Sequence, residues 1–103
     1  MLKLTKKLIG HISVDSGQVI IVDPCYLGEW QDGEAHPEDG TTNHYARTCK
    51  ITDDSEQHGG EMLVSGIGGF GVVSSTYIGD GRYPVYGYYD ETGMPTKITI
   101  EFT

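Results

Sequence analysis

The second half of the chain is a series of short segments with β-type alternation, separated by turns that contain glycine. In the last segment an apolar residue occupies every second position, so Ile98, Ile100 and Phe102 share one face and are expected to be buried. Fifteen glycines in 103 residues, about twice the usual share, suit many turns and short strands. The expected strands are 61–65, 70–76, 83–89 and 97–102. The pattern predicts a mostly β fold: an antiparallel meander forming a small sandwich or partly open barrel, as one domain over residues 1–103.

The first 24 residues add two expected strands. Residues 8–14 alternate apolar and polar side chains, and residues 15–18 have the composition of a turn. Residues 18–22 are apolar on both faces, which is typical of a central strand. We therefore expect 8–14 and 18–22 to form a hairpin that ends at Pro24, since proline has no N–H to donate to a ladder.

The middle of the chain differs in composition. Residues 28–61 contain nine of the fifteen acidic residues and three of the four histidines. Residues 28–44 are expected to form a long acidic loop, with a short helix around 37–39 as the alternative. Residues 45–52 alternate like a strand, and no ten-residue window has a helical period.

A net charge of −8 and an isoelectric point near 4.7 restrict the partners. Proteins that bind polyanions cluster Lys and Arg, and only Lys3, Lys6 and Lys7 cluster here. We therefore expect no nucleic-acid partner, while docking on a basic protein stays open.

The apolar residues after these lysines stop at Gly10, so no secretory signal is expected. The longest aliphatic run, Val19–Val22, is far shorter than a membrane span. These features predict a cytoplasmic protein with no membrane partner, in which Cys25 and Cys49 stay reduced.

Two short sequence motifs are candidates for a chemical function. Asp23, before Pro24-Cys25-Tyr26, is either a ligand acceptor at the end of a strand or the cap of the next turn. The glycine-rich string 65–71 lacks the Lys-Ser/Thr and the following helix of a phosphate loop, so it predicts a tight or bulged hairpin.

No cofactor or metal is expected. His36, His44 and His58 are spaced unlike any compact ligand motif. The acids of the middle segment lack the register of a calcium loop, and no two carboxylates stand out as a catalytic pair.

The strongest candidate for a binding site is the region around strand 83–89, where phenol rings accompany a guanidinium. Such a group suits stacking on a base or a sugar, although the rings could equally cover a thin sheet. Tyr83 and Tyr86 point to opposite faces, so at most one should stack on a ligand and the other should pack in the core. The complete set of expected ligand-binding residues is Asp23, Tyr26, Arg47, Tyr77, Asp80, Arg82, Tyr83 and Tyr86, and none is assigned as catalytic.

These residues also carry a family resemblance. Ser16-Gly17-Gln18 leads through a strand into Asp23-Pro24-Cys25-Tyr26, and Gly79-Asp80-Gly81 precedes Tyr83-Pro84-Val85-Tyr86. This order resembles a group of uncharacterised small bacterial and phage proteins. The resemblance implies a β-rich fold and a bacterial cytosol, and it carries over no catalytic residues. By analogy of class, some small phage β proteins sequester nucleotide signals of host immunity.

Three functions follow as hypotheses. The first is a non-catalytic module for a small polar or nucleotide-derived ligand, which would need its basic groups gathered in one pocket, for example in a homo-oligomer. The second is an acidic protein-interaction module that inhibits a host factor. The third is a small hydrolase or lyase that uses Asp23, His44 or Asp80.

Overall fold

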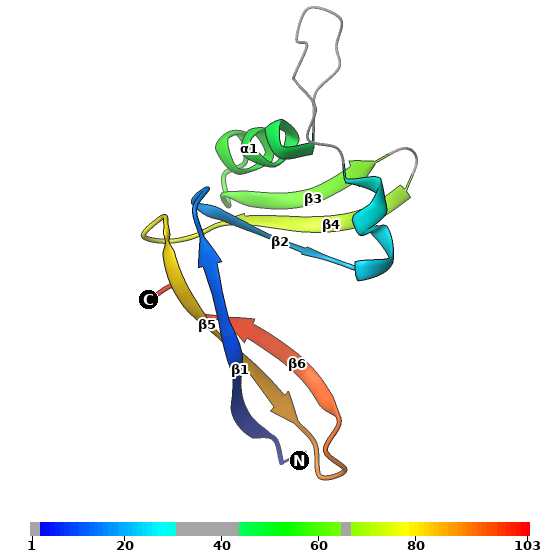
Figure 1. The fold of residues 1–103 in the computed structure, drawn as a ribbon, viewed down its shortest axis with the longest axis vertical. Coiled ribbons are helices and arrows are strands. Elements are labelled where there is room, and N and C mark those ends of the chain that lie inside the picture. The colour runs from blue at the N-terminus through cyan, green and yellow to red at the C-terminus, as the bar shows by residue number, and fades with distance from the viewer. Residues whose placement is uncertain (1–2, 31–43, 65–66) are drawn as a thin grey trace, which may run out of the picture. The chain divides into compact units, whose positions relative to one another are not determined.

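The computed structural model describes residues 3–30, 44–64 and 67–103 (Figure 1). The chain divides into two compact units: unit 1 is residues 1–17 with 76–103, and unit 2 is residues 18–75. The elements, in chain order, are β1 (Thr5–Val14), β2 (Gln18–Val22), the 3₁₀ helix η1 (Pro24–Glu29), α1 (His44–Asp54), β3 (Gly59–Val64), β4 (Ile67–Ser75), β5 (Gly81–Tyr89) and β6 (Pro95–Ile100).

Most of the described secondary structure is antiparallel strand, which confirms the mostly β fold class. Unit 1 contains the three-stranded sheet β1-β5-β6, and unit 2 contains the three-stranded sheet β2-β4-β3. Both sheets are open. β3 and β4 pair as the expected bulged hairpin, with a register shift between Met62 and Val64, but β4 begins at Ile67, so Ile67 to Gly69 belong to the strand and not to the expected connection. Most of the acidic loop expected at 28–44 lies outside the described residues.

The hairpin expected between 8–14 and 18–22 is wrong. β1 pairs with β5, and β2 pairs with β4. Gly17 does have the positive φ of a turn residue, at 68°, but its carbonyl accepts a hydrogen bond from the Thr76 N–H at 3.0 Å. A turn signal fixes where the chain bends and not which strand it will pair with: the ten-residue β1 matches the nine-residue β5 better than the five-residue β2.

The central position expected for 18–22 is wrong too. β2 is an edge strand, and the glycine- and valine-containing β4 is central. Ile21 is 54% exposed, while Ile20 and Val22 pack against the core. Apolar residues on both faces of β2 therefore did not mean that both faces are buried.

Residues 45–52 form part of α1 and not a strand, so the absence of helical periodicity was a wrong inference. The buried residues of α1 recur every four positions, but they are His44, Thr48 and Thr52. The burial of the two threonines is accompanied by hydrogen bonds that a hydropathy pattern does not reveal. Gln18, at the start of β2, donates from Nε2 to Thr48 Oγ1 at 2.8 Å, and the Thr52 hydroxyl donates to Gln18 Oε1 at 3.3 Å.

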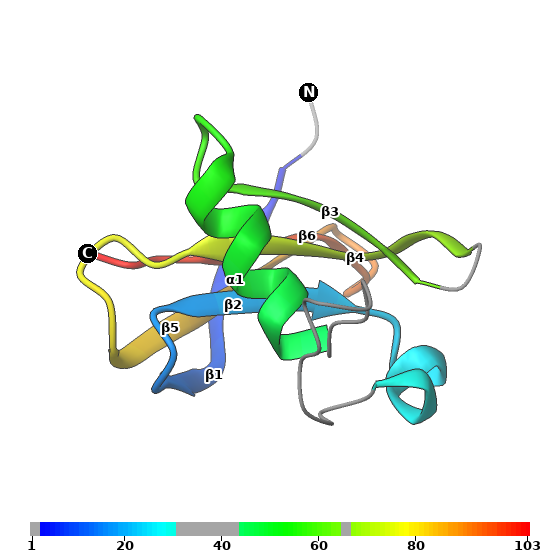
Figure 2. The ribbon, with the colours of Figure 1, turned by 90° about the horizontal axis from the view of Figure 1, so that it is seen from above.

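Unit 2 has the larger core. α1 lies across its sheet, against β3, β4 and β2 (Figure 2). Met62, Val64, Phe70 and Val73 are almost completely buried between the layers, and five partly buried apolar residues pack against them. Those five are Ile20, Val22, Tyr26, Trp30 and Ile51.

Among its described residues, unit 1 has a sheet and no helix. Val14 and Tyr83 are buried on one face of that sheet, where the Phe102 ring meets the Tyr83 ring edge-on at 5.4 Å. The burial expected for the final strand is wrong for Ile98, which is 51% exposed, while Ile100 and Phe102 are only half-buried. Strict alternation predicted which residues share a face but not whether a second layer covers it.

Candidate functional site

One face of the β1-β5-β6 sheet gathers basic and tyrosine side chains. Residues directly opposite each other in an antiparallel pair share a face. Tyr88 lies opposite both Lys6 and Lys97, and Tyr86 lies opposite Thr99 on the same face. Arg82 lies opposite Ser13, and His11 lies two residues along from Ser13. We call the set Lys6, His11, Arg82, Tyr86, Tyr88 and Lys97 the basic–tyrosine face.

The lysines of this face lie over its rings. Lys6 Nζ is 4.2 Å from the centroid of the Tyr86 ring and 6.0 Å from that of Tyr88. Lys97 Nζ is 4.4 Å from the Tyr88 centroid. These are cation–π distances, in which the negative ring face attracts the ammonium group. The contacts hold the two lysines and the two rings together at one end of the sheet.

A carboxylate, that of Glu101, lies next to Lys6. It accepts a hydrogen bond from Lys6 Nζ at 3.2 Å, and both side chains are more than one-third exposed. This hydrogen bond is the main reason that the pKa of Lys6 is raised above its usual value of 10.5. Lys6 therefore stays protonated across the physiological range.

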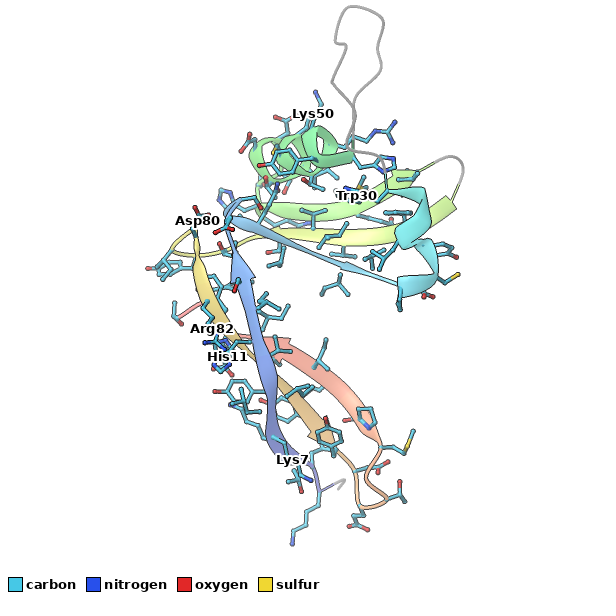
Figure 3. The ribbon with its side chains drawn as sticks, in the orientation of Figure 1. Lys7, His11, Trp30, Lys50, Asp80 and Arg82 are labelled. Carbon is cyan, nitrogen blue, oxygen red and sulfur yellow. The ribbon has the colours of Figure 1, made fainter. Side chains whose placement is uncertain are left out.

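The other end of the face carries Arg82 and His11, which lie beside each other on neighbouring strands (Figure 3). Both side chains are exposed. Arg82 is held at the start of β5 by a turn in which Gly79 has a φ of 88°. The expected candidates Asp80 and Tyr77 lie in the chain before this strand, and both are exposed, Tyr77 by 78%.

Tyr83 and Tyr86 divide between core and surface. Tyr83 is 4% exposed, and its hydroxyl donates to the Gly79 carbonyl at 2.6 Å. Its ring therefore belongs to the core of unit 1 and is not presented to a ligand. Tyr86 lies on the opposite face of β5, half-buried, under Lys6.

The three expected site residues of unit 2 each have a structural partner. Asp23 caps η1, with its carboxylate accepting from the Cys25 N–H at 2.9 Å. The Tyr26 ring stacks on Phe70 at 5.9 Å. Arg47 donates from Nη1 to the Leu63 carbonyl at 3.1 Å. These contacts account for the three side chains as parts of the fold.

The residues considered for catalysis or metal binding also have defined surroundings. His44 is buried between the rings of Trp30, at 5.4 Å, and Phe70, at 5.9 Å. His36 lies outside the described residues. Within the described ranges, no group of three or more His, Cys, Asp or Glu side chains is placed to hold a metal. Cys25 and Cys49 are free thiols in the structure.

Four members of the basic–tyrosine face were missed by sequence reasoning: Lys6, His11, Tyr88 and Lys97. The alternation within 83–89 does place Tyr88 on the face of Tyr86. Lys6, His11 and Lys97 lie on β1 and β6, so placing them on this face requires knowing that both strands pair with β5. The expected hairpin instead paired residues 8–14 with 18–22.

The charges of the chain are unevenly divided. Unit 1 holds five of the seven basic residues (Lys3, Lys6, Lys7, Arg82 and Lys97) and five of the fifteen acids. Unit 2 holds the other two bases and the other ten acids, so it carries the whole net charge of −8 while unit 1 is neutral.

No helix in the described part of the chain is long and apolar enough to cross a membrane. Comparison of the chain with protein-family models, with curated proteins and with solved structures gives no match.

Proposed function

We propose that this chain is a non-catalytic binding module whose basic–tyrosine face takes a ligand with an anionic group and an aromatic ring, of the nucleotide-derived class. The observation that supports the proposal is the set of three cation–π contacts, which places two lysines and two phenol rings on the sheet face that also carries Arg82. A cation recognises a phosphate, and a phenol ring offers a surface on which a base can stack. The resemblance to small phage proteins extends the proposal to sequestration of a nucleotide signal in a bacterial host.

Calorimetric titration with cyclic nucleotides and ADP-ribose derivatives tests this function. Arg82→Ala should weaken binding at least tenfold, which is about 1.4 kcal/mol, because the exposed guanidinium is the strongest phosphate donor on the face. The matched control is Lys50→Ala. Lys50 is an exposed base of unit 2, paired with Asp54 at 3.6 Å, and its removal should leave the affinity unchanged. If neither a compound of the panel nor a short oligonucleotide binds, or if both variants bind as wild type does, the proposal is wrong.

The division of charge favours a second candidate function, an acidic module that docks on a basic protein through unit 2. Ten acids against two bases in 58 residues create a negative potential that steers a basic partner. Asp53, Asp54 and Glu56 are exposed at the end of α1. Replacing them together with Asn, Asn and Gln should weaken a pull-down of such a partner and reduce its dependence on salt. A pull-down that ignores both salt and these substitutions would exclude this function.

A further inference from the structure

We infer that the ligand of the basic–tyrosine face is a single-stranded nucleic acid rather than a single nucleotide. The inference rests on the proposed function, because it concerns the same face, and it adds the length and class of the ligand. Three observations carry it: the length of the face, the mixing of rings with cations along it, and the separation of charge between the two units.

The face is longer than a mononucleotide. Arg82 and Tyr88 are six residues apart on β5, which corresponds to about 20 Å along an antiparallel strand. Arg82 and His11 occupy one end, and Lys6 and Lys97 occupy the other. A ligand that satisfies both ends must carry anionic groups at intervals over that length, as the backbone of a single strand does.

Side chains between and around the two ends offer contacts for bases. The half-buried Tyr86 and Tyr88 follow each other at alternate positions of β5, and Leu8, which is 54% exposed, lies opposite Tyr86. Proteins that bind single strands without sequence preference combine a basic track with aromatic rings on which successive bases stack. The flexible lysines that lie over the rings can transfer their ammonium groups to phosphates, which frees the rings for bases.

The net charge of the whole chain differs from the local charge of the basic–tyrosine face. The argument against a polyanion used the total of −8, and all of that total belongs to unit 2. The strands β1, β5 and β6 contain no Asp or Glu, and three of their bases (Lys6, Arg82 and Lys97) lie on the basic–tyrosine face; Glu101 follows β6 and pairs with Lys6, while Asp15 and Asp80 lie in the chain next to the Arg82 end. Glu101 and Lys6 form an exposed ion pair, which is a weak contact. A phosphate can therefore replace the Glu101 carboxylate as the partner of Lys6. Glu101→Gln should therefore strengthen binding.

Fluorescence anisotropy with a labelled oligo-dT of about ten nucleotides, a length within known single-strand site sizes, tests the inference. We expect the oligonucleotide to bind at least tenfold more tightly than dTMP, and the same sequence in a duplex to bind more weakly. If three cations contact phosphates, the logarithm of the association constant should fall with the logarithm of salt concentration with a slope of about −2. An oligo-U probe in a parallel titration reports whether the sugar matters.

Neighbouring lysines provide the matched control. Lys6 lies on the basic–tyrosine face, whereas Lys7 lies opposite Gly87 on the other face of the same sheet, with its ammonium 5.5 Å from the Tyr89 ring. Lys6→Ala and Arg82→Ala should each reduce the steepness of the salt slope by about 0.7. Lys7→Ala should leave the slope at its wild-type value. Circular dichroism of each variant serves as the control that it is folded.

The outcomes separate this inference from the proposed function. If a mononucleotide binds in an Arg82-dependent manner and the oligonucleotide binds no more tightly, the inference is overturned and the proposed function stands. If neither binds, both are overturned. If the oligonucleotide binds but Lys6→Ala and Lys7→Ala behave alike, the strand lies elsewhere on the protein and the inference is again overturned.

Discussion

The two phenylalanines of the chain provide a direct test of the packing. Phe70 is 1% exposed in the core of unit 2, where it contacts the rings of Tyr26 and His44. Phe102, in unit 1, is half-buried and touches Tyr83 with an edge-on ring. Phe70→Ala removes a fully packed ring and leaves a cavity, so the free energy of unfolding should fall by about 3–5 kcal/mol. Because Phe102 keeps part of its surface in water, Phe102→Ala should cost about half as much.

Urea denaturation measures both losses. Trp30 is the single tryptophan and packs against the core of unit 2, so its fluorescence reports the unfolding of that unit, while far-ultraviolet circular dichroism reports both sheets. At about 4–8 °C per kcal/mol for a domain of this size, Phe70→Ala should lower the melting temperature by at least about 12 °C. Equal losses for the two variants, or a larger loss for Phe102→Ala, would refute the assignment of the main core to unit 2.

Three further substitutions test local features of the fold. Tyr83→Phe removes the hydroxyl that donates to a backbone carbonyl of the preceding turn, and should cost about 0.5–1.5 kcal/mol in denaturation experiments. In Gly59→Ala the new Cβ would lie 2.5 Å from a backbone oxygen of β4, so the melting temperature should fall, whereas in Gly68→Ala the new Cβ meets nothing within 4 Å and should leave it nearly unchanged. A hydrogen bond from the Thr92 side chain is the main reason that the pKa of Asp90 is below its usual 3.8. The stability from this carboxylate is therefore present above pH 3.8 and is lost as the pH falls through the lowered pKa, so Asp90→Asn should be less stable than wild type at neutral pH and equally stable in strong acid.

The strands of the second half could be predicted from the sequence, because alternation and turn residues are local signals. Strand 83–89 and the final strand have their expected faces, and the strands on either side of residues 65–66 pair as a hairpin. The same alternation predicts that Arg82 and Tyr86 share a face of β5, but the burial of Tyr83 on the other face comes from the structure.

The missed features depend on distant partners. α1 buries Thr48 and Thr52 because Gln18, some thirty residues earlier, completes their hydrogen bonds. β1 pairs with a strand about seventy residues away, and this pairing alone brings Lys6 onto the rings of the candidate site. No local pattern contains either relationship.

The discontinuity of unit 1 has a consequence for how the chain is made. Synthesis on the ribosome proceeds from the N-terminus, and domains generally fold as units during it. Unit 2 is one continuous segment, so its sheet and helix can assemble as soon as residue 75 has emerged. β1 is made first and yet must wait, with its backbone N–H and C=O groups unpaired, until β5 is translated. A nascent chain stalled after residue 75 would therefore present β1 as an unpaired segment, with Val14, which is buried in the finished structure, uncovered, and with Lys3, Lys6 and Lys7 as the charges that discourage pairing with another chain.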